Sequence, residues 1–104
     1  MRSPRLLLAS LLAASSFGAA QAQTAAELNT RTLAATCANC HGTDGRAVAG
    51  EAMVALAGLP PGHIAAQMKA FREGTRTATV MHQIAKGYTP EQIDAIAAYF
   101  ATKK

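Results

Sequence analysis

The chain has 104 residues, with ten Lys or Arg against six Asp or Glu, and this length allows one small domain at most. Its formal net charge of +4 falls to +2 without the segment 1–22, because Arg2 and Arg5 lie there. So small a charge, spread along the whole chain, excludes the concentrated basic face that nucleic-acid binding requires.

The first element in chain order is a predicted secretory signal peptide over residues 1–22. Arg2 and Arg5 precede the apolar run Leu6 to Ala14, and small residues then lead to Ala20-Gln21-Ala22, a cleavage site of the A-x-A type. The mature domain would cover residues 23–104, where no apolar run approaches the roughly 20 residues of a membrane span. We therefore expect an exported, periplasmic protein.

The first half of the mature domain is predicted to be one helix followed by a loop. Thr24 and Glu27 form a capping box, which opens a helix that continues to about Ala38. Glycines then mark a loop over residues 42–58. Within this loop, residues 51–56 could form a short helical turn.

The second half is predicted to contain three more helices. One begins at the Pro-Pro pair 60–61 and ends at Gly74. A short one contains Val80, Met81 and Ile84 and is stopped by Gly87. The last begins with a capping box over residues 89–92. No pair of strands is predicted, so the fold class is all-α. The longer helices carry apolar stripes formed by Ile64, Met68 and Phe71, and by Ile93, Ile96 and Phe100.

The predicted core is poor in large side chains. After Gln23, and without the two Cys, the chain has 18 large apolar residues against 19 Ala. Domains of this size usually need a disulfide, a metal or a cofactor for stability. A disulfide between near neighbours closes almost no loop and stabilises little, so we expect another group at the centre.

The segment Cys37-Ala38-Asn39-Cys40-His41 has the C-x-x-C-H spacing of covalent haem attachment. Two thiols at this spacing can each bind one haem vinyl group, and the adjacent His then lies under the iron as its proximal ligand. The alternatives are a thioredoxin-like C-x-x-C, half of a zinc site, or a chance match. Thioredoxin chemistry expects a βαβ setting, and for zinc only His63 and His82 would remain as further histidine ligands.

The mature chain also resembles class I c-type cytochromes. Among these it resembles the small monohaem cytochrome subunit of flavocytochrome c sulfide dehydrogenase and cytochrome c4-like domains. The resemblance implies a small class I fold with N- and C-terminal helices packed around one covalently bound haem c. It rests on the segments CANCHGTDG (37–45), LAGLP (56–60), QMKAFREGTR (67–76), TVMHQIAKGY (79–88) and IAAYF (96–100).

One segment departs from the family pattern. Relatives usually carry a Pro just before Leu-Ala-Gly, whereas this chain has Met53-Val54-Ala55-Leu56. A backbone carbonyl of this segment can still accept a hydrogen bond from the His41 ring, although the segment is less rigid without the Pro.

The second iron ligand has to come from a segment that can wrap around the ring. Met68 lies on an apolar helix stripe, where Met is more often a core filler, and Met53 lies in the loop that closely follows His41. Met81 lies much further along the chain, just before the last helix, and has the necessary reach; the resemblance places the ligating Met there as well. His82 should point away if Met81 points in. The full set of candidates is Met53, Met68, Met81, His63 and His82, with an open site as a further alternative.

These observations predict a non-enzymatic one-electron carrier. Cys37 and Cys40 would hold the haem, and His41 and Met81 would ligate iron on its proximal and distal sides. A six-coordinate iron with a thioether ligand favours the ferrous state and has no position for a substrate. By resemblance, a flavoprotein sulfide dehydrogenase subunit is the expected redox partner. The alternatives are a haem enzyme or gas sensor with a labile sixth ligand, and a thiol oxidoreductase.

Two further groups of residues have predicted roles. Apolar side chains are expected to pack against the haem or between helices, and they are Leu33, Leu56, Leu59, Ile64, Phe71, Ile84, Ile93, Ile96 and Phe100. Three basic residues could neutralise haem propionates, meet an acidic partner, or simply be solvated, and they are Arg46, Arg76 and Lys86.

Overall fold

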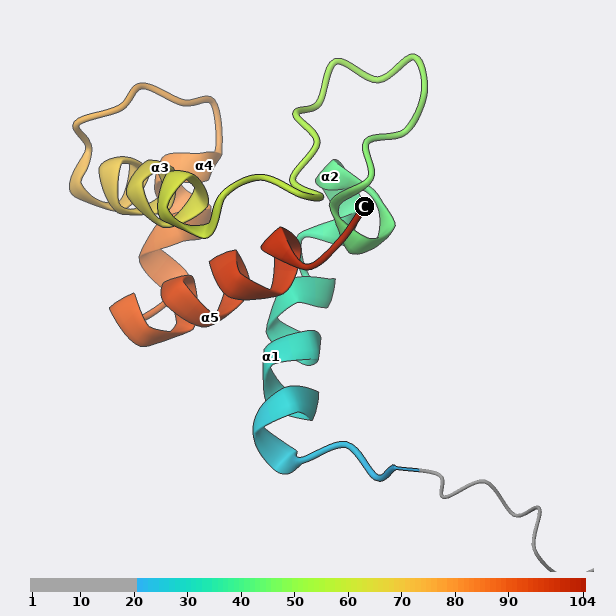
Figure 1. The fold of residues 1–104 in the computed structure, drawn as a ribbon. Helices are drawn as coiled ribbons and strands as arrows, with labels where there is room; N and C mark the ends of the chain where they lie inside the picture. The colour runs from blue at the N-terminus through green and yellow to red at the C-terminus, as the bar shows by residue number, and fades with distance from the viewer. Residues whose placement is uncertain (1–20) are drawn as a thin grey trace, which may run out of the picture.

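The computed structural model describes residues 21–104, so all but the last two residues of the predicted signal peptide lie outside the described part. The described residues form five α-helices and two 3₁₀ turns and contain no strand, as the all-α prediction requires (Figure 1). The elements are α1 (Ala25–Ala35), α2 (Ala38–His41), η1 (Thr43–Gly45), α3 (Pro61–Glu73), α4 (Met81–Ile84), η2 (Ala85–Gly87) and α5 (Pro90–Ala101).

Both predicted capping boxes are present. The Thr24 side chain accepts a hydrogen bond from the Glu27 backbone N–H at 3.2 Å, and the Glu27 carboxylate accepts one from the Thr24 N–H at 2.7 Å. The residue pair Thr89 and Gln92 makes the same reciprocal contacts at the start of α5. Each box satisfies backbone donors that the first helical turn leaves without partners.

The other predicted helix boundaries differ in one place. Helix α3 begins at Pro61 and is closed by Gly74 in the left-handed conformation, as predicted. Helix α1, however, ends at Ala35 rather than near Ala38, because a turn at residues 36–37 redirects the chain into α2. The haem-attachment motif therefore lies almost entirely on a separate short helix.

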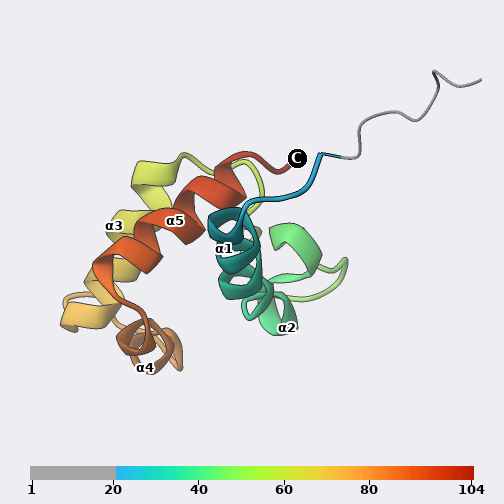
Figure 2. The same cartoon turned by 90° about the horizontal axis from the view of Figure 1, so that it is seen from below.

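Helix α5 lies between α1 and α3 and packs against both (Figures 1 and 2). Helix α4 in turn packs against α3. The contact between α1 and α5 is the pairing of N- and C-terminal helices that the family resemblance implies. Among residues 21–104, no helix is long and apolar enough to cross a bilayer.

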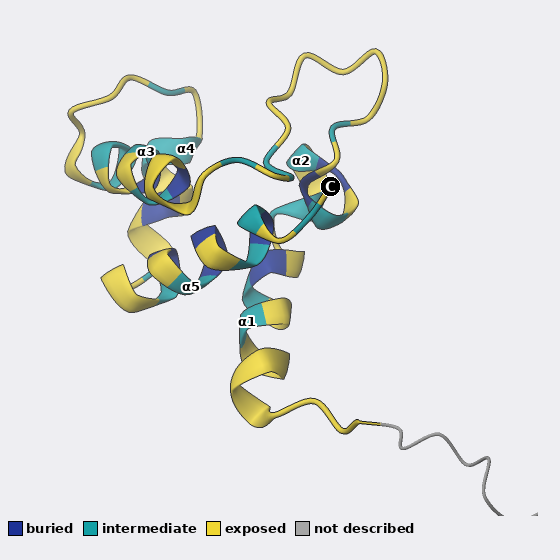
Figure 3. Ribbon diagram, viewed as in Figure 1, coloured by how far each residue is buried: buried dark blue, intermediate teal, exposed yellow. Residues whose placement is uncertain are grey.

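The buried core lies where α5 faces α1 and α3 (Figure 3). The predicted stripe on α5 is almost completely buried, with Ile93, Ile96 and Phe100 no more than 2% exposed. Three of the eight core residues are alanines, so the cluster is small even for this chain length. The complete cluster is Ala34, Ile64, Met68, Ala85, Ile93, Ile96, Ala97 and Phe100.

The predicted loop after α2 is present, and residues 51–56, which could have formed a short helical turn within it, form none. The backbone N–H groups of Leu56 and Ala57 instead donate to the Gly45 carbonyl at 2.8 and 3.1 Å. Since these donors are bound to a residue far back in the loop, they are lost to helical i to i−4 bonds. The Gly58 N–H then donates to the Phe100 carbonyl at 2.9 Å and attaches the loop to α5.

Candidate functional site

A largely apolar cavity of about 310 Å³ opens between α2, the loop after it, α3, α4 and α5. Its volume falls at the lower end of the range for small-molecule and cofactor sites. Helix α3 provides one wall, the loop a second and α5 a third. The main apolar residues of these walls are Leu56, Leu59, Ile64, Met68, Phe71 and Ile96.

All four predicted site residues line this one cavity. Cys37 caps the start of α2, Cys40 and His41 end that helix, and Met81 begins α4. One helical turn is enough to bring the two sulfur atoms and the imidazole to the same region. Met81, which is distant from them in the sequence, reaches the cavity because α4 packs against α3.

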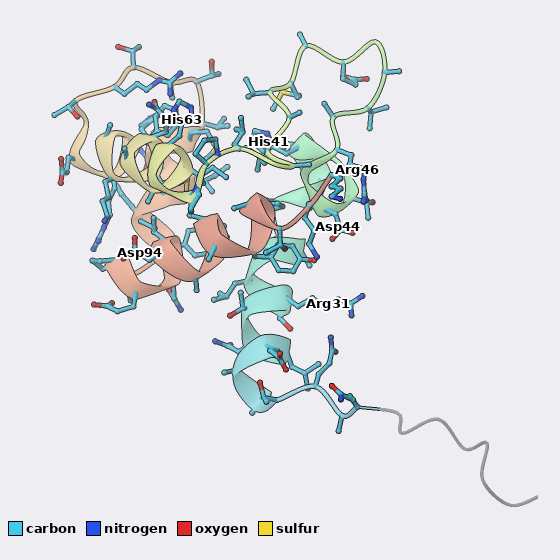
Figure 4. The ribbon with its side chains drawn as sticks, viewed as in Figure 1. Arg31, His41, Asp44, Arg46, His63 and Asp94 are labelled. Atoms are coloured by element: carbon cyan, nitrogen blue, oxygen red, sulfur yellow. The ribbon has the colours of Figure 1, made fainter. Side chains whose placement is uncertain are left out.

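The His41 ring has a defined orientation. Its Nδ1 lies 2.6 Å from the Val54 carbonyl oxygen (labelled His41 in Figure 4). Because a carbonyl can only accept, Nδ1 carries the proton of this hydrogen bond, and in the neutral imidazole Nε2 is then the nitrogen that can bind a metal. Such a bond orients a metal-binding His and makes it a better donor to the metal. The prediction that a carbonyl of the 53–56 segment can bind this ring is confirmed.

The Cys37 thiol lacks the low pKa expected of a reactive C-x-x-C cysteine. Cys37 and Cys40 share no disulfide, and burial raises the pKa of the Cys37 thiol above its ordinary value. Reactive C-x-x-C cysteines need the opposite shift, since the thiolate is the nucleophile. No strand precedes the motif in residues 21–104, and the thioredoxin-like alternative is therefore disfavoured.

The zinc alternative is also disfavoured. In the part of the chain that the structure describes, no three His, Cys, Asp or Glu side chains converge on a point where they could hold a metal ion. A structural zinc site needs four such ligands.

The competing axial ligands separate into two groups. Met53, Met68 and His63 also line the cavity, while His82 is absent from its walls. Met68 is 7% exposed and belongs to the buried core, as expected for a stripe residue. His82 has a buried Nδ1 without a hydrogen-bond partner among the described residues.

Two side-chain contacts at the cavity were not predicted. The hydroxyl groups of Thr36 and Tyr88 lie 2.6 Å apart and join the end of α1 to the residue after η2. The Arg76 guanidinium donates to the Gln67 side chain and lies over the Phe71 ring, 4.8 Å from its centroid. Thr36 and Tyr88 come from distant elements, whereas Arg76 lies in the loop just after α3 and folds back onto that helix.

Ile84 differs from the other residues with a predicted packing role. It is 41% exposed, although it lines the cavity. Leu33, Leu56, Leu59 and Phe71 are partly buried against the core cluster.

The donor set fits a covalently held haem. An imidazole whose Nδ1 is bound to a backbone carbonyl, two thiols on the same turn and a thioether all line one apolar cavity. These are the groups found at c-type haem sites.

Comparisons with known proteins agree with this chemistry. A model of the family described as "Cytochrome C oxidase, cbb3-type, subunit III" matches residues 21–100. The cytochrome subunit of sulfide dehydrogenase from Chlorobaculum tepidum is 44% identical over 68 residues, which are 65% of this chain and 60% of that protein. A thiosulfate dehydrogenase electron acceptor from Stutzerimonas stutzeri is 38% identical over 65 residues, which are 62% of this chain and 30% of that protein.

The fold also has a solved counterpart. Cytochrome c4 from Acidithiobacillus ferrooxidans matches with a TM-score of 0.67 and 30% identity, covering 80% of this chain and 52% of the solved one. The chain thus spans 60% or less of the length of both curated relatives and about half of the solved structure. The matched family, the fold and the donor set lead to one conclusion: this chain belongs to the cytochrome c family, as a class I c-type cytochrome whose cofactor is one covalently bound haem c.

Proposed function

We propose that the chain is an exported one-electron carrier in which Cys37 and Cys40 hold the haem while His41 and Met81 ligate its iron. The observation that carries this proposal is that His41 and Met81 come from separate elements, α2 and α4, and line the same cavity. His41 is already oriented by the Val54 carbonyl.

The choice of Met81 over its competitors is supported by the position of each side chain. His82 is absent from the cavity walls, and Met68 belongs to the packed core. Met53 lies in the same loop as Val54, whose carbonyl already binds the His41 ring on the proximal side. Met81 lies on a different element and needs no rearrangement of the core to act as a ligand.

When bound, haem would supply a reversible one-electron redox couple at its iron. His41 and Met81 would occupy both axial positions of the iron and leave none for a substrate, and the thioether favours the reduced state. The apolar walls around Ile64 and Ile96 keep water from the site and lower the local dielectric constant. This arrangement suits electron transfer to another protein rather than catalysis on a small molecule.

The expected partner is an enzyme that oxidises a reduced sulfur compound. Two relatives are named as the cytochrome subunit of sulfide dehydrogenase and as the electron acceptor of thiosulfate dehydrogenase. We propose that this chain accepts electrons from a dehydrogenase of this class, with a flavoprotein sulfide dehydrogenase subunit as the first candidate. The partner would perform the sulfur chemistry, and this chain would carry the electrons away.

The test is to express the full chain in a bacterial host with c-type haem maturation and to compare Met81→Leu with its matched control, Met53→Leu. We expect the parent and Met53→Leu to show the weak far-red ferric band of Met ligation. Met81→Leu should lose this band, bind carbon monoxide in the ferrous state and have a lower reduction potential. The holoprotein should appear in the periplasmic fraction with Gln23 at its N-terminus.

Each part of the proposal can fail separately. If Met81→Leu keeps the far-red band and the potential of the parent, the ligand is another residue. If the parent itself binds carbon monoxide rapidly, the sixth position is open or labile, and a haem enzyme or gas sensor replaces the carrier.

A further inference from the structure

The residue that signal cleavage would leave at the N-terminus is a glutamine. Cleavage after Ala20-Gln21-Ala22 makes Gln23 the first residue of the mature chain. Gln23 is exposed and belongs to no helix. The new α-amine and the side-chain carboxamide of this one residue can therefore approach each other.

These two groups can react with each other without a further reagent. The α-amine nitrogen attacks the side-chain amide carbon Cδ, so that an N–Cδ bond closes a five-membered lactam, and the Cδ–Nε2 bond breaks. The departing nitrogen takes one proton from the amine and leaves as ammonia. No electron is transferred, and the product is an uncharged pyroglutamyl residue.

The start of helix α1 favours this reaction. Gln23 directly precedes Thr24, the N-cap of α1, and the backbone N–H groups of a first helical turn concentrate positive charge at that end. A charged α-ammonium is unfavourable there, whereas the uncharged amine, which is the nucleophile, is favoured. Cyclisation then removes the unfavourable charge permanently.

The side chains around Gln23 do little to retain an ammonium group. Two acidic and two basic side chains share a polar hollow with it, and they are Glu27, Arg31, Asp44 and Lys103. The Glu27 carboxylate already accepts from the N–H of Thr24 at 2.7 Å and from its hydroxyl at 2.9 Å. The Asp44 carboxylate accepts from Tyr99 at 2.6 Å and lies 3.4 Å from Arg46. Both carboxylates thus have partners, and the two cations of the hollow disfavour a third positive charge.

The capping box of α1 uses no atom that cyclisation changes. It is made by Thr24 and Glu27, and the first helical bond runs from the Leu28 N–H to the Thr24 carbonyl. The lactam therefore costs the helix no hydrogen bond. It also blocks the α-amine that aminopeptidases need, and so it protects Thr24, which is the second residue of the mature chain.

We propose that Gln23 cyclises to pyroglutamate in the exported protein, and that the lactam protects the N-cap of α1 from trimming. The proposal rests on the signal cleavage of the proposed function. Loss of Thr24 would remove the side chain that caps the first helical turn, and α1 is one of the two helices against which α5 packs.

The experiment measures the intact mass of the haem-loaded protein from the periplasm, before any digestion, for the parent and for Gln23→Asn. Asn keeps a side-chain amide but would have to close a strained four-membered ring. We expect the parent to be lighter by one ammonia than the mass calculated for residues 23–104 with haem, and Gln23→Asn to have its full calculated mass. An added aminopeptidase should shorten Gln23→Asn past Thr24 and leave the parent unchanged.

The masses separate a failure of this proposal from a failure of the proposed function. A parent that begins at Gln23 with its full mass, or begins at another residue after cleavage, is exported but overturns the proposal. A parent that retains residues 1–22 overturns signal cleavage and the proposal together.

Two further results would also refute cyclisation at Gln23. Loss of an ammonia from Gln23→Asn would place the reaction at another residue, and shortening of the parent by the aminopeptidase would show an open N-terminus. If Gln23→Asn is not exported, Gln23→Ala, which has no side-chain amide, replaces it as the control.

Discussion

Gly45 shows how strictly a single position can be constrained in this fold. Its φ of +74° lies in the left-handed region, and a Cβ there would lie 2.8 Å from the Ala57 nitrogen and 2.8 Å from Phe100 Cδ1. One of these atoms is backbone and the other belongs to a core ring that is 1% exposed, so neither can move cheaply. The carbonyl of Gly45 also anchors Leu56 and Ala57.

We expect Gly45→Ala to destabilise the holoprotein by about 2 kcal/mol or more, through backbone strain together with overpacking. Urea unfolding of the parent and the variant measures this loss. Gly50→Ala is the matched control, because Gly50 has a φ of +86° but nothing within 4 Å of its Cβ position. Gly50→Ala therefore has the backbone strain without the overpacking. An equal loss of stability in both variants would show that packing at Gly45 is unimportant.

At the scale of elements, helix α5 depends on the cap at its first turn. The Thr89 side chain accepts from the Gln92 N–H at 3.2 Å, and α5 is the helix that packs against both α1 and α3. Thr89→Ala should therefore lower the free energy of unfolding by about 1 kcal/mol, measured by chemical denaturation. Thr89→Ser should retain most of the stability because it keeps the hydroxyl acceptor.

The control for this prediction is Thr79→Ala, which alters an exposed threonine in the loop before α4. Surface substitutions of that kind usually change the free energy of unfolding by less than about 0.5 kcal/mol. A Thr89→Ala variant no less stable than Thr79→Ala would contradict a stabilising role for this capping box.

At the scale of the whole molecule, one hydrogen bond joins η1, in the first half of the domain, to the C-terminal helix. The Tyr99 hydroxyl donates to an Asp44 carboxylate oxygen at 2.6 Å, although the two residues are far apart in the sequence. This bond lowers the pKa of Asp44, with smaller contributions from Lys103 and Arg46. The same bond raises the pKa of Tyr99 above its ordinary value.

The stabilisation by this bond should depend on pH in a defined direction. Because the pKa of Asp44 is lowered in the folded state, the stabilisation by this bond is full above the pKa of an unfolded Asp carboxyl, about 3.9. It is lost as pH falls through the lower pKa that Asp44 has in the folded protein. Because the pKa of Tyr99 is raised in the folded state, the stabilisation by this bond is full below about pH 10. It is lost as pH rises through the higher pKa that Tyr99 has in the folded protein. Tyr99→Phe should therefore be less stable than the parent at neutral pH, with a difference that shrinks in strong acid.

Tyr88→Phe serves as the control for this pH dependence. The Tyr88 hydroxyl pairs with the Thr36 hydroxyl, a group that does not titrate in the acid range, so its stability difference should stay constant there. Unfolding free energies of the three proteins as a function of pH measure both effects. A Tyr99→Phe difference that stays constant into strong acid would contradict the role of Asp44.

Much of the fold could be predicted because its signals are local. The two capping boxes, the Pro-Pro pair at the start of α3 and Gly74 after it act within one or two helical turns, so the residues themselves specify those boundaries. The predicted end of α1 was wrong, and the possible turn at 51–56 is absent, for the opposite reason. Both depend on where the chain goes next, as the bonds from Leu56 and Ala57 to Gly45 show.

The sequence by itself determined the all-α class, the haem-attachment motif and the lack of large core residues, because each follows from composition or from spacing over a few positions. Only the tertiary structure decided which distant groups meet: Val54 with His41, Tyr99 with Asp44, and Arg76 with the cavity that Met81 also lines. Such contacts arise from the packing of α5 against α1 and α3 and of α4 against α3. Packing depends on the shape of the whole chain, so no short pattern encodes it.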